Sequence, residues 1–277
     1  MHPRTCVSGI STFRLSLAED IEFWSRHGIA AVGVSLAKVA AAGWEPATTA
    51  LARAVDAGLE IVDLIGLGAF DLARPDSWER GRETGIRAVE TAARLGVPRV
   101  VFTTGRFVPL TWEDAADAYA LAVAPVVAAA ADSGVAFAIE HTNPLRPDVG
   151  FVHTLRDAVD LARRLDVGVC MEINACWAER DLDATIAAGI DRISLVQVSD
   201  FRVGTVASSQ RLVPGDGDIP LVRIVDTLLA AGYPGRFELE LIGDAILAEG
   251  YDAAVPRAVA WLDRLLADRA PEAIRPT

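Results

Sequence analysis

The run AGLEIV at residues 57–62 joins the end of a helix, a glycine and the start of a buried strand. The runs LGVPRVV at 95–101, SGVAFAI at 133–139 and AGIDRIS at 188–194 repeat the same order. Glycine commonly ends a helix in a left-handed conformation, and a short apolar run after it is typical of a strand buried on both faces. The repeated run therefore predicts helices that alternate with parallel strands.

This alternation extends over the whole chain as eight short apolar runs, each followed by an alanine-rich segment of helical period. The expected strands are 6–10, 30–34, 60–64, 100–103, 135–140, 167–172, 194–199 and 236–241. Eight such units favour an α/β fold with a single (β/α)8 TIM barrel over an open doubly wound sheet. No G-x-G-x-x-G follows the first strand, and GLG at 66–68 is too short to count. We expect the barrel to span residues 1–270 and the tail 271–277 to be disordered.

Helix boundaries are also legible. Ser16 and Glu19 form the pattern of a capping box before a helix over residues 21–27. Five glycines stand where helices should end: Gly28, Gly58, Gly96, Gly134 and Gly189.

Composition narrows the class of function. The chain has 277 residues, 52% of them hydrophobic, which suits one large domain with a sizeable core. A net charge of -12 disfavours nucleic acid as a partner, because such proteins need a basic surface. No apolar run reaches the ~18 residues that cross a bilayer, so we expect a cytoplasmic protein with no membrane partner. A homo-oligomer stays open.

The three cysteines, Cys6, Cys170 and Cys176, are odd in number and lack C-x-x-C spacing. Neither a disulfide framework nor a structural zinc site is indicated, and we expect the thiols to pack as small hydrophobic groups.

Functional groups of a TIM barrel lie where the strands end. Oxygen-bearing side chains follow four consecutive strands here: Glu140; Glu172 and Asn174; Gln197 and Asp200; Glu238 and Glu240. Several buried carboxylates need a counter-charge, and an all-oxygen set suits one divalent ion such as Mn²⁺ or Mg²⁺. For any single carboxylate, a helix cap or an arginine pair is an equal alternative, but not for four in series.

Within this set, Glu240 is preferred over Glu238 because it is nearer the end of its strand. Gln197 points inward if Val196 and Val198 pack against the helices. His141 and Asn174 are candidates for substrate binding.

The segment 201–219 after the seventh strand is long enough to act as a lid or a substrate clamp. Arg211 is its natural group for binding an anion or a hydroxyl, although a surface position is equally compatible with the composition.

The stretches FAIEHTNP at 137–144, VGVCMEINACW at 167–177, ISLVQVSDFR at 193–202 and RLVPGDGDIPLVRIVDTLLAAGYPGRFELE at 211–240 resemble the xylose-isomerase-like barrel superfamily of sugar phosphate isomerases and epimerases. The resemblance covers the second half of the chain well and the first half in outline. It implies that the metal ligands are Glu140, Glu172, Gln197 and Glu240, and the glutamine at 197 resembles the hydroxypyruvate isomerase branch.

Two residues depart from the family pattern. The family usually has Asp at the position of Glu172 and often His at the position of Ala175. A specialised substrate or a degenerate site would each explain these differences.

The leading hypothesis is a divalent-metal-dependent isomerase or epimerase of a small sugar or keto substrate. Glu140 and Glu240 would move a proton through an enediolate intermediate. A metal-dependent dehydratase or lyase begins with the same proton abstraction, and a non-catalytic barrel subunit would bind metal weakly or not at all. A role like that of AP endonucleases would need more histidines and a basic face.

Overall fold

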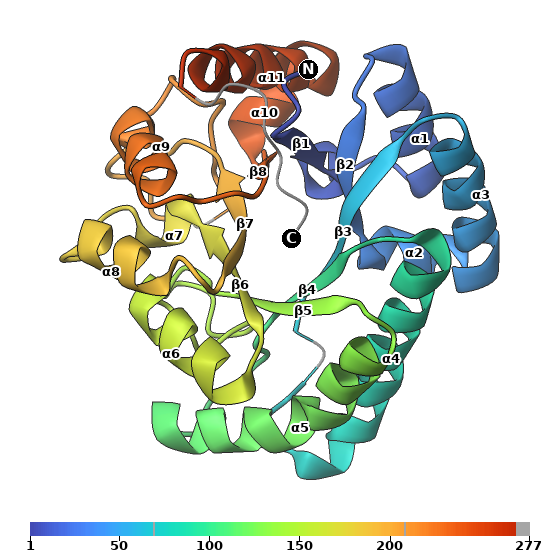
Figure 1. The fold of residues 1–277 in the computed structure, drawn as a ribbon, viewed down its shortest axis with the longest axis vertical. Helices are drawn as coiled ribbons and strands as arrows, with labels where there is room; N and C mark the ends of the chain where they lie inside the picture. The colour runs from blue at the N-terminus through green and yellow to red at the C-terminus, as the bar shows by residue number, and fades with distance from the viewer. Residues whose placement is uncertain (69, 208, 270–277) are drawn as a thin grey trace.

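Eight parallel strands close into a barrel in which each strand pairs with the next in sequence and β8 pairs with β1. The computed structural model describes residues 1–68, 70–207 and 209–269 (Figure 1). The strands are β1 (Thr5–Ser8), β2 (Ala31–Ser35), β3 (Glu60–Gly66), β4 (Arg99–Thr103), β5 (Ala136–Glu140), β6 (Gly168–Glu172), β7 (Ile193–Val198) and β8 (Phe237–Leu239). The predicted (β/α)8 barrel is confirmed and the open-sheet alternative is wrong. The tail predicted at 271–277 lies outside the described residues.

Two strands end two residues before their predicted ends: β1 is predicted at 6–10 and β8 at 236–241. β1 ends at Ser8, whose side chain accepts a hydrogen bond from the Ile10 backbone and begins the 3-10 helix η1 (Gly9–Thr12). β8 ends before Glu240 because the Ser11 hydroxyl takes over the ladder bonds. It donates to the Leu239 carbonyl and accepts from the Leu241 amide, both at 2.9 Å.

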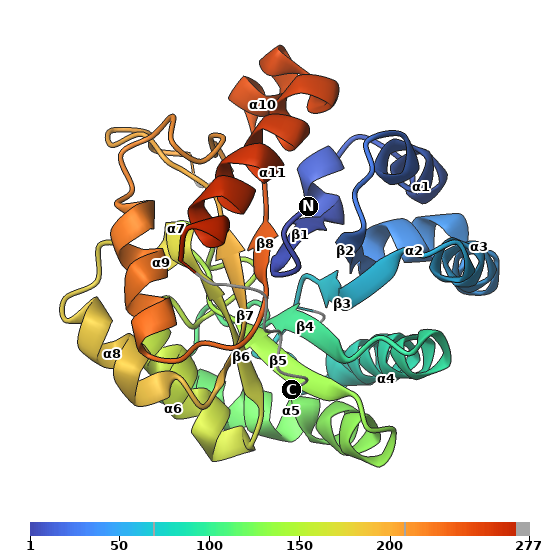
Figure 2. The same cartoon turned by 45° about the horizontal axis from the view of Figure 1, so that its top comes forward.

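Helices surround the strands as an outer ring (Figure 2). They are α1 (Leu17–Arg26), α2 (Leu36–Ala42), α3 (Trp44–Asp56), the 3-10 helix η2 (Pro75–Ser77), α4 (Trp78–Leu95), α5 (Trp112–Asp132), α6 (Leu155–Leu165), α7 (Ile173–Cys176), α8 (Leu182–Gly189), α9 (Leu221–Ala230), α10 (Asp244–Glu249) and α11 (Tyr251–Ala267).

The predicted capping box of α1 is confirmed, because Ser16 and Glu19 each accept a hydrogen bond from the other's backbone. The predicted glycine stops are confirmed by positive φ angles at Gly28, Gly58, Gly96 and Gly134. The prediction for Gly189 is wrong. It is the last residue of α8, and a Cβ there would lie 2.5 Å from a methyl group of Val159, so its size serves helix packing.

The hydrophobic core has two parts. A large cluster fills the layer between strands and helices, and it includes Val196 and Val198, as expected for an inward Gln197. A small cluster lies inside the barrel and contains Cys6, Ala31, Val62, Ile65, Val101, Ala138, Cys170 and Leu195. The three cysteines are free and buried, in line with their expected role as small hydrophobic groups. Half of these inner residues are Cys or Ala, and their small size leaves space that polar side chains occupy.

Two register shifts turn polar residues into that space. In the β2–β3 pair, Val32 lies opposite Ile61 and Gly33 lies opposite Asp63, so Val62 is an extra residue. In the β6–β7 pair, Ser194 is extra. A bulge changes which face the following residues occupy, and these two direct Asp63 and Gln197 to the barrel interior.

Helix α5 has the length and mean hydropathy, 1.4, of a membrane span. It packs instead as a barrel helix against α4 and β5, and its buried residues include Tyr119 and Val126. The core helix of a barrel passes the same test, so this helix is no argument for a membrane.

The loops after β3, β4 and β5 are joined at Gly105. Its backbone amide donates to the Val149 carbonyl at 2.8 Å, and Arg106 donates to the Phe70 carbonyl at 3.0 Å. Gly105 has φ +90°, and a Cβ there would lie 2.5 Å from the Phe70 oxygen. Only glycine fits this junction without displacing backbone.

We expect Gly105→Ala to lower the free energy of unfolding more than Gly58→Ala does. Gly58 also has a positive φ, +101°, but no atom lies within 4 Å of the position its Cβ would take. For the Gly58 variant, the free energy of unfolding should therefore fall only by the cost of a left-handed alanine, about 1–2 kcal/mol. For the Gly105 variant, overpacking should lower the free energy of unfolding by roughly a further 1–3 kcal/mol. Urea unfolding measures both, and equal losses would show that the junction shifts freely.

Candidate metal centre

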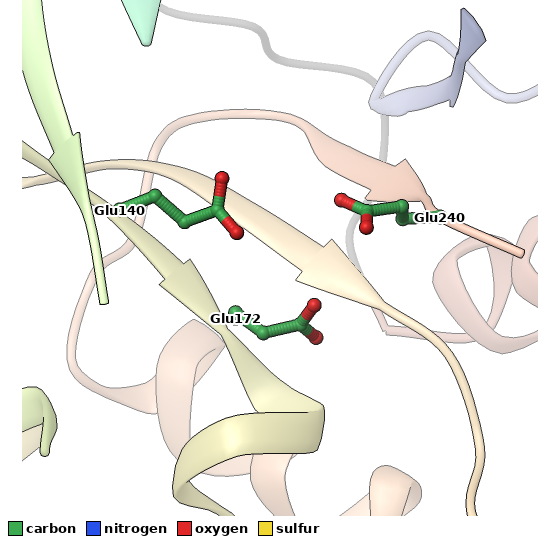
Figure 3. A group of neighbouring side chains, drawn as sticks. All are labelled: Glu140, Glu172 and Glu240. Carbon is green, nitrogen blue, oxygen red and sulfur yellow. The ribbon is translucent and has the colours of Figure 1, made fainter. Parts of the chain in front are cut away.

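Three glutamates converge at the carboxyl-terminal end of the barrel. Glu140 ends β5, Glu172 ends β6 and Glu240 directly follows β8, and one carboxylate oxygen of each lies within 4.8 Å of the others. Figure 3 shows the three carboxylates pointing toward a common space. All three side chains are buried, so their charges act on one another with little screening by water.

Burial and mutual repulsion raise the pKa values of two of these acids. The pKa of Glu140 is well above its usual range because of burial and the nearby Glu240 and Glu172 charges. Burial raises the pKa of Glu172 to about 7, while Arg211 acts in the opposite direction. Both shifts are those of carboxylates that lack sufficient positive charge.

Arg211 supplies part of that charge. Its Nη1 forms ion pairs with Glu172 and, at 2.9 Å, with Glu240. Burial alone would lower the pKa of Arg211, but the three glutamates outweigh it and raise the pKa. The surface alternative for Arg211 is wrong, since its side chain is only 12% exposed. Once all three carboxylates are ionised, a single guanidinium leaves the centre two positive charges short.

Gln197 lies beside the triad. It pairs with Glu172 on one side of β7 and with Glu238 on the other. Its Nε2 donates to Glu238 Oε2 at 3.1 Å, and its Oε1 has no hydrogen-bond partner among the described residues. A buried amide oxygen without a partner is a ready ligand for a cation.

This donor set fits the divalent ion that the sequence predicts. It combines three carboxylates, one free amide oxygen and a shortfall of two positive charges. Glu240 Oε2 is also buried and has no hydrogen-bond partner in the described part of the chain. Oxygen donors of this kind suit a hard ion.

His141 and Asn174 lie around Glu172. The backbone amide of Glu172 donates to His141 Nε2 at 3.2 Å, and the amide of Asn174 donates to Glu172 Oε1 at 2.9 Å. His141 is fully buried on the opposite face of its strand end from Glu140. Its ring thus supports β6 from within the protein, and its predicted contact with substrate stays a prediction. Asn174 Nδ2 has no hydrogen-bond partner among the described residues, so Asn174 stays a candidate for substrate binding.

Asp200 organises the loop that carries Arg211. Its carboxylate accepts hydrogen bonds from the backbone amides of Phe201, Gly215, Gly217 and Ile219, at 2.9–3.1 Å. The backbones of Asp200 and Leu212 also pair. Asp200 is one of the strand-end oxygen groups that the sequence indicates, but its carboxylate oxygens accept hydrogen bonds from the loop backbone. The P-G-D-G-D run at 214–218, with two glycine amides, is the signal of this turn.

Two buried acids below the triad were not selected from the sequence. Asp63 and Glu238 are both fully buried inside the barrel. Burial raises the pKa of Asp63 to about 7, with Arg99 lowering it and Glu240 raising it. Burial, Asp63 and Glu240 raise the pKa of Glu238 well above its usual range. Asp63 stands in a sequence run typical of one apolar strand. The sequence does not show that its side chain points into the barrel, because this depends on the bulge at Val62.

A sequence profile of the xylose isomerase-like TIM barrel family matches residues 21–265. The chain belongs to this family. A comparison with curated proteins finds no match.

Solved structures give the same fold. A protein of Sinorhizobium meliloti 1021 is 25% identical, with a TM-score of 0.80 over 96% of this chain and 98% of that one. The IolI protein, solved with a zinc atom, is 17% identical, with a TM-score of 0.83 over 97% and 100%. D-psicose 3-epimerase from Clostridium cellulolyticum H10, solved with D-tagatose, is 16% identical, with a TM-score of 0.77 over 95% and 99%.

We expect His141 to make folding sensitive to acid. Burial, with His153 nearby, lowers the pKa of His141 to about 3. The unfolded imidazole has a pKa of about 6.5, so below that pH the unfolded state binds one more proton and stability falls. His141→Gln keeps an acceptor for the Glu172 amide and cannot titrate. Between pH 7.5 and pH 5 the wild type should lose about 2 kcal/mol more than this variant. Urea unfolding at both pH values measures the difference, and parallel profiles would contradict a neutral buried imidazole.

Proposed function

We propose that this protein is a divalent-metal-dependent isomerase or epimerase of a small sugar or hydroxy-ketone. The observation that carries the proposal is the buried convergence of Glu140, Glu172 and Glu240. Membership of the xylose isomerase-like family and the sugar epimerases among the structural neighbours support it.

Glu140, Glu172, Glu240 and the Gln197 oxygen would hold the ion. A bound Mn²⁺ or Mg²⁺ would supply positive charge that stabilises the negative oxygens of an enediolate-like transition state. The buried set of ligands would keep the reacting carbon away from bulk water.

Proton transfer falls to Glu140 and Glu240. They come from β5 and from the end of β8, and their carboxylates approach the centre from different sides (Figure 3). One would remove the proton next to the substrate carbonyl, and the other would return it to the neighbouring carbon or to the opposite face.

Arg211 would bind a substrate oxygen. Its Nη1 is held by Glu172 and Glu240, but its buried Nε has no hydrogen-bond partner within the described residues. A planar guanidinium that keeps an unused N–H donor is suited to orient a hydroxyl or carbonyl group. The cytoplasmic location and the absence of nucleic-acid or membrane partners stay predictions, and a homo-oligomer stays open.

Metal removal should lower the melting temperature. An ion that binds only the folded state stabilises it by about 2.7 kcal/mol at a concentration one hundred times Kd. We expect chelator to lower the melting temperature and Mn²⁺ or Mg²⁺ to restore it. Glu240→Ala should remove most of this shift, whereas Glu22→Ala, on the exposed side of α1, should keep it. Differential scanning calorimetry measures the effect, and insensitivity of the wild type to chelator would rule out the site.

Glu140→Gln and Glu240→Gln should separate ligand from base, because the amide keeps an oxygen but cannot accept the proton. We expect turnover to fall by about 10²–10⁴ while Mn²⁺ still binds. The assay screens ketopentoses, ketohexoses and hydroxypyruvate in D2O. Wild-type product should carry deuterium at the reacting carbon, and turnover without deuterium would indicate hydride transfer. A product that has lost water would identify the dehydratase alternative.

A further inference from the structure

Glu238 is a buried carboxylate that the proposed reaction does not use. It lies on β8 with an exposed fraction of 0% and forms no ion pair within the described part of the chain. Its one hydrogen bond with another side chain is the 3.1 Å contact that Gln197 Nε2 donates to Oε2. A buried carboxyl group with so few partners costs folding free energy, so a structural reason alone does not account for it.

Gln197 needs an external partner to present its oxygen. A carboxamide carries an acceptor oxygen and a donor nitrogen on the same carbon, and rotation by half a turn exchanges them. The triad offers only carboxylate acceptors, with Glu172 directly beside Gln197 in the ladder. These acceptors attract the NH2 end, which would point a donor at the place of the cation. Glu238 is an acceptor on the other side, and it draws the NH2 end away.

The barrel makes room for this acceptor. A Cβ at Gly33 would lie 1.9 Å from Glu238 Oε1 and 2.8 Å from Asp63 Oδ1. The glycine on β2 therefore leaves the space into which both side chains extend, and the bulge at Val62 brings Asp63 to its edge. A bulkier residue at 33 would push Glu238 out of its place.

We propose that Glu238 is a positioning residue that holds the Gln197 amide nitrogen so that Oε1 faces Glu140, Glu172 and Glu240. The inference rests on the proposed metal ion and adds a determinant of its affinity. Groups that orient a metal ligand commonly change metal affinity by about 10–100-fold when they are removed.

Titration of Mn²⁺ into chelator-stripped protein tests the affinity. Glu238→Met removes the acceptor and should weaken Mn²⁺ binding tenfold or more, roughly. Glu238→Gln is the matched control, since its amide oxygen can still accept from Gln197 Nε2, and it should stay within about threefold of wild type. Glu238→Asp keeps the carboxyl group but withdraws the acceptor by about 1.5 Å, so it should weaken binding even if the Met variant folds poorly.

A double-mutant cycle with Gln197→Ala separates orientation from general damage. In the Gln197→Ala background, Glu238→Met should change Mn²⁺ affinity no further. An equal loss in both backgrounds, or wild-type affinity in the Met and Asp variants, would overturn the inference.

A second readout needs no metal. In the stripped protein, the side-chain NH2 protons of Gln197 should exchange slowly with solvent in wild type and Glu238→Gln, and faster in Glu238→Met, as followed by NMR. Unchanged exchange in the Met variant would overturn the inference while leaving the metal centre intact. Wild type that binds no Mn²⁺ would overturn the proposed function, and the role of Glu238 in metal affinity with it.

Discussion

Repulsion among buried carboxylates is the constraint on which the end of this barrel depends. Glu140, Glu172 and Glu240 are brought within 4.8 Å by three different strand ends, and in their ionised form they need a positive charge beside them. Arg211 provides one such charge and thereby ties the loop after β7 to β6 and β8. Asp200 in turn shapes that loop through four backbone amides. The charge balance of the centre therefore depends on the conformation of the loop that carries Arg211.

The interior below the centre follows from the same need for space. Small residues line part of the barrel interior, namely Cys6, Ala31, Gly33, Ala138 and Cys170. They leave space that aliphatic side chains do not fill. Polar groups enter instead, and the bulges in β3 and β7 orient them. The barrel therefore has a polar axis that leads from Asp63 through Glu238 and Gln197 to the triad. Most of the hydrophobic core lies in the layer between the strands and the helices.

The fold could be predicted from the sequence because every barrel unit repeats the same local signals. Apolar strands, helical period and glycine stops are short-range properties, and they placed all eight strands within a few residues. The strand ends also located Glu140, Glu172 and Glu240, since parallel strands end at the same edge. Asp63 and the contact between Gln197 and Glu238 could not be found this way. They depend on bulges and on cross-strand register, which a single strand does not encode. Asp166, which caps α6 with a φ of 55°, likewise replaces the glycine that stands at the ends of α1, α3, α4 and α5.

The two departures from the family pattern have different structural meanings. At position 172 the longer carboxylate is fully integrated, because Oε1 accepts from the Asn174 amide and Oε2 pairs with Arg211. The His141 ring holds the backbone at the same residue. A decayed position would lose such contacts first, since nothing would maintain three partners around a buried charge that costs free energy. Ala175, by contrast, stands in the short helix α7 directly after Glu172 and offers no polar group to a substrate. Under the proposed function, the retained contacts at Glu172 favour a specialised substrate over a degenerate site.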